Sequence, residues 1–136
     1  MLRNVSYNDP EIDREIDRDV GRAFSWRERF RRRGIGSPRM SIRTASAEIF
    51  VLLCRDTNPN TCNIELRPRG VIVRFRSRLE TYALVIPYYR LSVYKGRPDE
   101  YSLYRAQHFV RVEANARVHA FMNRVVEYRA AEAQRR

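Results

Sequence analysis

Residues 62–86 read CNIELRPRGVIVRFRSRLETYALVI, and this stretch decides the fold. It holds three short runs rich in β-branched and aromatic residues, at Cys62–Leu66, Val71–Arg76 and Tyr82–Ile86. Between the first two runs, Arg67-Pro68-Arg69-Gly70 has the composition of a turn. Strands this short, joined by short turns, are typical of an antiparallel meander rather than of β-α-β units.

The strand pattern extends on both sides of this stretch. Toward the C-terminus, three further strands are predicted at Leu91–Tyr94, Tyr101–Tyr104 and Phe109–Val112. Turn residues precede the first of them at Pro87 and the second at Lys95-Gly96-Arg97-Pro98-Asp99. Toward the N-terminus, Ala45–Cys54 reads ASAEIFVLLC and is apolar on both faces toward its end, which predicts a central, buried strand. A turn cluster at residues 56–60 follows it. About seven strands are therefore expected.

A helix is predicted to close the chain, from about Ala114 to Ala133. Its apolar residues recur at the spacing of one helix face, which indicates docking on the sheet: Val118, Phe121, Met122, Val125 and Tyr128. The predicted fold class is therefore α+β, an antiparallel meander or partly open barrel closed by a C-terminal helix.

A second helix is predicted near the N-terminus, from about Pro10 to Arg33. Asp9 is a good N-cap, and Gly34 follows a run of arginines as expected at a helix end. Acidic residues dominate its first half and arginines its second. Residues 34–41 are rich in glycine, serine and proline, so we place a domain boundary there. It separates a helix and linker (1–40) from a sheet domain (41–136).

Seven strands followed by one amphipathic helix resemble the pleckstrin-homology-like fold. Ile64–Val73 looks like the second hairpin of that superfamily, and Leu84-Val85-Ile86-Pro87-Tyr88 is similar to a strand entry in its bacterial and GRAM-type members. The resemblance covers about residues 45–133 and implies a module that binds phosphoinositides, peptides or proteins. Lipid-binding members carry a basic motif across the first hairpin, and this chain departs from it, with only Arg55 beside the corresponding loop.

The charge of the chain is strongly positive, at +11 over 136 residues, and Lys95 is the only lysine. Arginine binds phosphates and carboxylates through a planar fork, which suits an anionic partner. An equally good interpretation is that the arginines only solvate the surface, and that a genome rich in G and C accounts for their number. Charge bears on association rather than on fold.

No run of about 20 apolar residues is present, and residues 1–10 lack the apolar segment of a secretory signal, so no transmembrane segment is expected and a cytoplasmic location is predicted. Cys54 and Cys62 lie symmetrically about Asn58 and are expected to face each other across a hairpin. Their spacing, and that of His108 and His119, is not that of a zinc site, so neither a metal nor a cofactor is expected.

One candidate anion site follows the turn and strand at 67–78. Arginines recur there without an acid between Glu65 and Glu80, and alternation along a strand places several of them on one face: Arg67, Arg69, Arg74, Arg76 and Arg78. The interpretation we favour is a solvated face whose arginines pair with acids on neighbouring strands. Tyrosines are interleaved with the basic residues, so a nucleic-acid-binding surface is the alternative.

A second candidate is the apolar stripe of the N-terminal helix, which could bind a partner: Ile12, Ile16, Val20, Trp26 and Phe30. The basic part, Trp26 to Arg33, could lie at an interface with its two aromatic residues as anchors. We favour docking of the stripe on the sheet or on a second copy, because isolated amphipathic helices are only marginally stable.

The sequence shows no glycine-rich phosphate loop and no nucleophile elbow, and its histidines have no apparent catalytic partners. We therefore expect a binding module rather than an enzyme, engaging a protein partner or an anionic surface. The alternatives are nucleic-acid binding through the arginine-lined strand and structural self-association through the first helix or a sheet edge. The sequence leaves the oligomeric state open.

Overall fold

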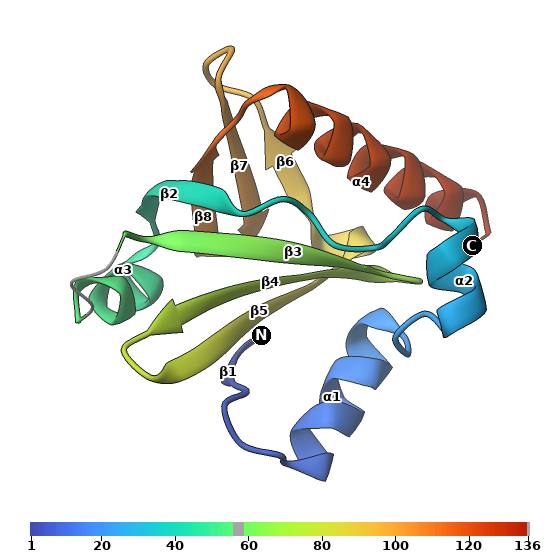
Figure 1. Ribbon diagram of the computed structural model, residues 1–136, viewed down its shortest axis with the longest axis horizontal. Helices are drawn as coiled ribbons and strands as arrows, with labels where there is room; N and C mark the ends of the chain where they lie inside the picture. The colour runs from blue at the N-terminus through green and yellow to red at the C-terminus, as the bar shows by residue number, and fades with distance from the viewer. Residues whose placement is uncertain (56–58, 136) are drawn as a thin grey trace.

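A computed structural model describes residues 1–55 and 59–135. These residues form an α+β fold built on an open, antiparallel sheet of eight strands in the order β1-β5-β4-β3-β2-β8-β7-β6 (Figure 1). The strands are β1 (Leu2–Asn4), β2 (Met40–Ala45), β3 (Thr61–Arg67), β4 (Gly70–Ser77), β5 (Glu80–Pro87), β6 (Ser92–Tyr94), β7 (Glu100–Arg105) and β8 (His108–Glu113). The helices are α1 (Pro10–Val20), α2 (Trp26–Arg31), α3 (Ala47–Cys54) and α4 (Ala116–Gln134), with a 3₁₀ turn at Tyr88–Arg90.

Strands β3, β4 and β5 form the predicted meander in one continuous register. Ile64 lies opposite Val73, which in turn lies opposite Leu84. Side chains alternate across a strand, so these three share one face, which we call the inner face. Ile72 and Arg74 of β4 point to the opposite, outer face.

Helix α4 packs on the inner face, where the main core lies (Figure 1). Val118, Phe121, Met122 and Val125 are buried there, and Asn115 Oδ1 caps the helix by accepting the Val118 N–H at 3.0 Å. The predicted C-terminal helix and the six predicted strands that correspond to β3–β8 are therefore confirmed. None of the helices in the described part of the chain is long and apolar enough to cross a membrane.

The prediction of a strand at Ala45–Cys54 is wrong. Residues 47–54 form helix α3, and the strand of this region is β2, which starts inside the predicted linker. Ile49 and Leu53, one helical turn apart, are buried, whereas Phe50 and Val51 are exposed. A short run that is apolar all round does not distinguish a helix from a strand, and packing of one helix face decides it here. Part of the turn predicted at 56–60 lies outside the described residues.

The prediction of a single long N-terminal helix is also wrong, because the helix breaks at Gly21. That glycine has a φ of 88°, in the left-handed region that glycine adopts without steric cost. Helix α2 then starts afresh, and its Ser25 Oγ accepts the Glu28 N–H at 3.3 Å. The break separates the acidic half of the predicted helix from the arginine-rich half.

Helix α1 packs on the outer face of β4 and β5. Ile16 and Val20 are buried against Ile72, Ala83 and Val85 in a second, smaller core. Ile12 packs at the edge of this core. The first three residues of the proposed partner-binding stripe therefore contact the sheet of their own chain.

The two cysteines do not face each other, because Cys54 ends α3 while Cys62 lies in β3. Cys54 is exposed and Cys62 is buried, and both are free thiols. Burial raises the pKa of the Cys62 thiol to about 12, which suppresses its reactive thiolate. We expect an aromatic disulfide reagent to modify one thiol of the folded protein rapidly and the other only on unfolding. Cys54→Ser should abolish the rapid phase, and equal rates for both thiols would contradict this arrangement.

Candidate functional site

The five arginines of the predicted anion site do not form one continuous row. Arg67 ends β3, Arg69 lies in the following turn, and Arg74 and Arg76 lie on the outer face of β4. Arg78 occupies the next turn with a φ of 57°, and its Nε donates to the Arg55 carbonyl oxygen at 3.1 Å. Each of these positions gives the guanidinium a different environment.

Arg67 links the sheet to the end of α1. Its side chain is buried, and its Nε donates to Glu65 Oε2 at 2.6 Å. Its Nη1 donates to Asp17 Oδ1 at 3.2 Å and to the Gly21 carbonyl oxygen at 2.9 Å. With its donors engaged inside the protein, Arg67 is a structural residue rather than a surface ligand for anions.

Glu65 is the acid that neutralises this end of the row. It also accepts a hydrogen bond from Arg74 Nη1 at 2.6 Å. Burial alone would raise the pKa of Glu65, but the guanidinium groups of Arg67 and Arg74 outweigh it and hold that pKa below its ordinary value. Arg69 Nη2 donates to the carbonyl oxygens of Asp17 and Arg18 at 3.3 and 3.2 Å. Both carbonyls lie in the last turn of α1, where the negative end of the helix dipole favours a cation.

The tyrosines and these arginines do not gather on one surface. Tyr88 is buried and donates its hydroxyl to the Arg67 carbonyl oxygen at 3.1 Å, and Tyr82 stacks on Phe75. Tyr94 contacts Tyr104 edge to face in the β6–β7 part of the sheet. The interleaving of tyrosine and arginine along the sequence therefore does not become one surface in the fold.

Part of the outer face is not covered by α1 and forms a hollow of about 240 Å³. We call it the outer-face hollow, and its polar lining residues are Arg39, Thr61, Asn63, Arg74, Arg76 and Thr81. Arg74 and Arg76 are the two residues of the predicted site that meet here. Arg39 was not predicted from the sequence, because it precedes β2 and reaches the hollow only through the pairing of β2 with β3.

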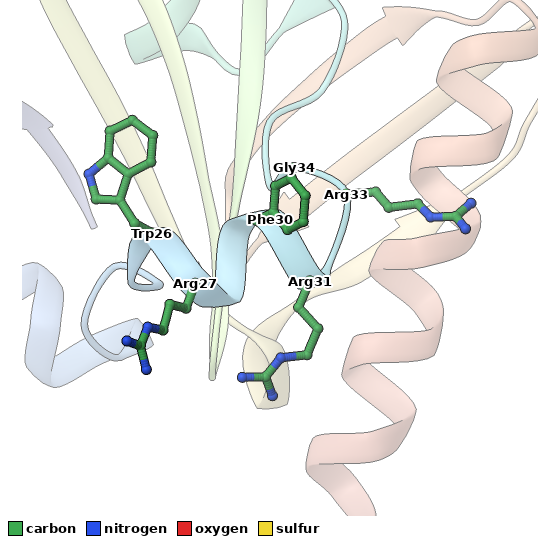
Figure 2. Close-up of a pocket in the computed structure, with 6 residues that line it drawn as sticks. All are labelled: Trp26, Arg27, Phe30, Arg31, Arg33 and Gly34. Carbon is green, nitrogen blue, oxygen red and sulfur yellow. The ribbon is translucent and has the colours of Figure 1, made fainter.

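A second hollow, open and about 960 Å³ in volume, lies over α2. We call its lining residues the α2 surface: Trp26, Arg27, Phe30, Arg31, Arg33 and Gly34. Figure 2 shows Trp26 and Phe30 on one side of the helix and Arg27 and Arg31 leaving from the other. Trp26 is 87% exposed and Phe30 is 89% exposed.

The opposite side of α2 is fixed to the rest of the protein. Arg29 Nε donates to the Phe24 carbonyl oxygen at 3.0 Å. The guanidinium carbon of Arg32 lies 4.3 Å from the ring centroid of Phe24 and 5.2 Å from that of Tyr128, which belongs to α4. These contacts hold α2 with its two aromatic side chains directed away from the core. The interpretation favoured from the sequence is docking of the stripe on the sheet or on a second copy. Trp26 and Phe30 do not dock on the sheet, and docking on a second copy stays a prediction.

The break at Gly21 also separates charges. On α1, Asp17 pairs with Arg67, and Asp19 Oδ2 lies 2.6 Å from Arg105 Nη1. In the described part of the chain, by contrast, no carboxylate pairs with any of three arginines of the α2 surface: Arg27, Arg31 and Arg33. Asp17 and Asp19 therefore contribute to the fold, while these three arginines of the α2 surface stay available.

Comparison with known proteins found no protein-family model, no curated protein and no solved structure that matches the chain significantly.

Proposed function

We propose that this chain is a non-enzymatic binding module that docks on an anionic membrane surface through the α2 surface. One observation carries the proposal: two large aromatic side chains, Trp26 and Phe30, project almost fully into solvent beside arginines that have no acidic partner among the described residues. An exposed tryptophan and phenylalanine on one helical turn are costly to leave in water unless something covers them.

The arrangement around α2 matches what a helix needs to lie in a membrane interface. Such a helix buries its aromatic residues among the headgroups and keeps its basic residues toward the lipid phosphates. Trp26 and Phe30 are four residues apart and so share one face, and Arg27 and Arg31 are four apart on the other. Long arginine side chains can reach around the helix to the headgroups while their stems stay apolar.

Electrostatics favours the same surface. A basic residue near an anionic leaflet contributes about 1 kcal/mol, so three arginines contribute roughly 3 kcal/mol before any aromatic insertion. The acidic first half of the N-terminal segment would oppose this if it continued the same helix. The break at Gly21 and the ion pairs of α1 remove much of that opposition.

The only tryptophan of the chain is Trp26, so its fluorescence reports directly on the proposed contact. With phosphatidylcholine vesicles that contain phosphatidylserine, we expect the emission to shift to shorter wavelength and to be quenched by brominated acyl chains. Vesicles of phosphatidylcholine alone should bind much more weakly. Arg27→Ser with Arg31→Ser should weaken binding roughly tenfold or more, since each arginine contributes about 1 kcal/mol.

A matched control removes two exposed arginines away from α2, one on α1 and one in the turn between β6 and β7, by Arg14→Ser with Arg97→Ser. This pair lowers the net charge equally and should change binding by less than about threefold, because charges far from the contact are screened. Equal losses in both double variants, or an unchanged emission with anionic vesicles, would contradict the proposal. Binding of an RNA oligonucleotide or an acidic protein, without binding of vesicles, would assign the surface to that partner instead.

A further inference from the structure

The outer-face hollow lies over β3, β4 and β5 and is built by strand register. Asn63 of β3 lies opposite Arg74 of β4, and Arg76 of β4 lies opposite Thr81 of β5. Alternation along each strand places these side chains on the outer face, beyond the part that α1 covers. Thr61, at the start of β3, completes this side of the lining.

Positive charge is concentrated in the hollow. Three guanidinium groups line it. Glu65 forms an ion pair with only one of them, that of Arg74, and its other carboxylate oxygen pairs with Arg67. Arg39 and Arg76 are exposed, and neither has an acidic partner in the described ranges 1–55 and 59–135. Like charges gathered at one place repel each other, and an anion that enters between them relieves the repulsion.

We propose that the outer-face hollow binds a phosphate group, carried by a small phosphomonoester or by inorganic phosphate. The arginine forks supply planar pairs of donors, and Asn63, Thr61 and Thr81 add neutral donors around them. A phosphate has more acceptor oxygens than a carboxylate and uses such a set more fully. At about 240 Å³ the hollow is smaller than the roughly 300–1,000 Å³ of drug-sized pockets, which limits the ligand to a phosphate with a small substituent.

This site is separate from the α2 surface. The hollow adjoins the Thr61 end of β3, whereas the segment that leads into α2 contacts the Arg67 end through the Gly21 carbonyl oxygen. The seven residues of β3 span about 20 Å at roughly 3.3 Å per residue. A variant in the hollow therefore leaves the α2 surface intact, and the two proposals can fail independently.

The test titrates the full chain with inorganic phosphate at constant ionic strength, with chloride as the competing anion, and follows backbone amide resonances. We expect saturable shifts at Asn63, Arg76 and Thr81. Arg76→Ser and Arg39→Ser should each weaken phosphate binding about tenfold or more, because each removes a charge-assisted donor pair. Both side chains are exposed, so the variants should fold, and the control Arg14→Ser should bind phosphate like the parent.

Two sources of the phosphate group are distinguished by a second titration, with vesicles that contain phosphatidic acid. Binding of free phosphate, lost in Arg76→Ser, supports a soluble ligand. Binding only of these vesicles, measured in Arg27→Ser with Arg31→Ser so that the α2 surface contributes little, and lost on adding Arg76→Ser, supports a lipid headgroup. Absence of both, shifts centred outside the hollow, or equal losses in Arg14→Ser would overturn the proposal.

Discussion

Replacing Arg67 with methionine is expected to lower the free energy of unfolding by about 3 kcal/mol, because it breaks a buried ion-pair network and leaves charged partners behind. Methionine keeps much of the stem volume but removes the donors to Glu65, Asp17 and the Gly21 carbonyl oxygen. The loss should appear as a lower urea midpoint with little change in the slope of the transition. Arg76→Met, at an exposed position on the same face, should change stability by less than about 0.5 kcal/mol.

The effect of Arg67→Met should also depend on pH. The pKa of Glu65 is lower in the folded protein than its ordinary value, so its ionised form stabilises the fold at pH above that ordinary value. This stabilisation is lost as the pH falls through the lower, folded pKa. The difference between parent and variant should therefore be largest near neutral pH and shrink on acidification. A variant as stable as the parent at neutral pH would show that Arg67 is dispensable to the fold and free to bind a ligand.

Gly70→Ala is expected to be the most destabilising small substitution, by about 3 kcal/mol or more, because it overpacks a site lined by backbone. The added methyl group would collide with the Ile86 carbonyl oxygen and Val20 Cγ1 and would lie 2.8 Å from Pro87 Cα. Backbone atoms cannot turn aside as a side chain can. Strand β4 or helix α1 must therefore shift, which loosens the smaller core.

Thermal unfolding measures this effect, and a loss of about 3 kcal/mol corresponds to a fall in Tm of roughly 10 °C for a chain of this size. Gly36→Ala provides the control, because no neighbouring atom lies within 4 Å of its added methyl group and its φ is not positive. That variant should stay within about 0.5 kcal/mol of the parent. Similar melting temperatures for both alanine variants would show that α1 packs less closely on Gly70 than described.

The parts of the fold that could be predicted from the sequence are those that neighbouring residues determine. Runs of β-branched and aromatic residues mark the strands from β3 to β8, turn residues mark three of the breaks between them, and helical spacing marks the face of α4. The run AEIFVLLC gave the wrong element because its eight residues are almost all apolar, so that neither period stands out. The buried side of this segment is decided by packing against the rest of the fold, and a local sequence pattern carries no information about that packing.

The break in the N-terminal helix shows the same limit. The apolar stripe continues past Gly21 at helical spacing, and a glycine inside a helix costs only about 1 kcal/mol relative to alanine. Contacts distant in sequence decide the break: Arg67 binds the Gly21 carbonyl oxygen, and a Cβ at Gly21 would lie 3.2 Å from Pro68 Cβ. Such contacts depend on the assembled sheet.

The candidate sites were only partly visible in the sequence for a related reason. Arg74 and Arg76 were correctly placed on one strand face, since alternation is a local property. Arg67 is paired with Asp17, 50 residues earlier, so its burial could not be read from its own surroundings. Trp26 and Phe30 carried a usable signal, two aromatics one helical turn apart in a segment of arginines. The apparent continuity of the helix assigned them to the buried stripe instead.

The two edges of the open sheet limit how the protein can aggregate. The edge strands β1 and β6 contain only three residues each, so few unpaired backbone groups are presented to another chain. Long exposed edges promote strand addition and fibril growth, and adsorption on a surface raises the local concentration at which this happens. A protein that accumulates on a membrane through α2 would thus be protected from β-sheet polymerisation by the shortness of its outermost strands.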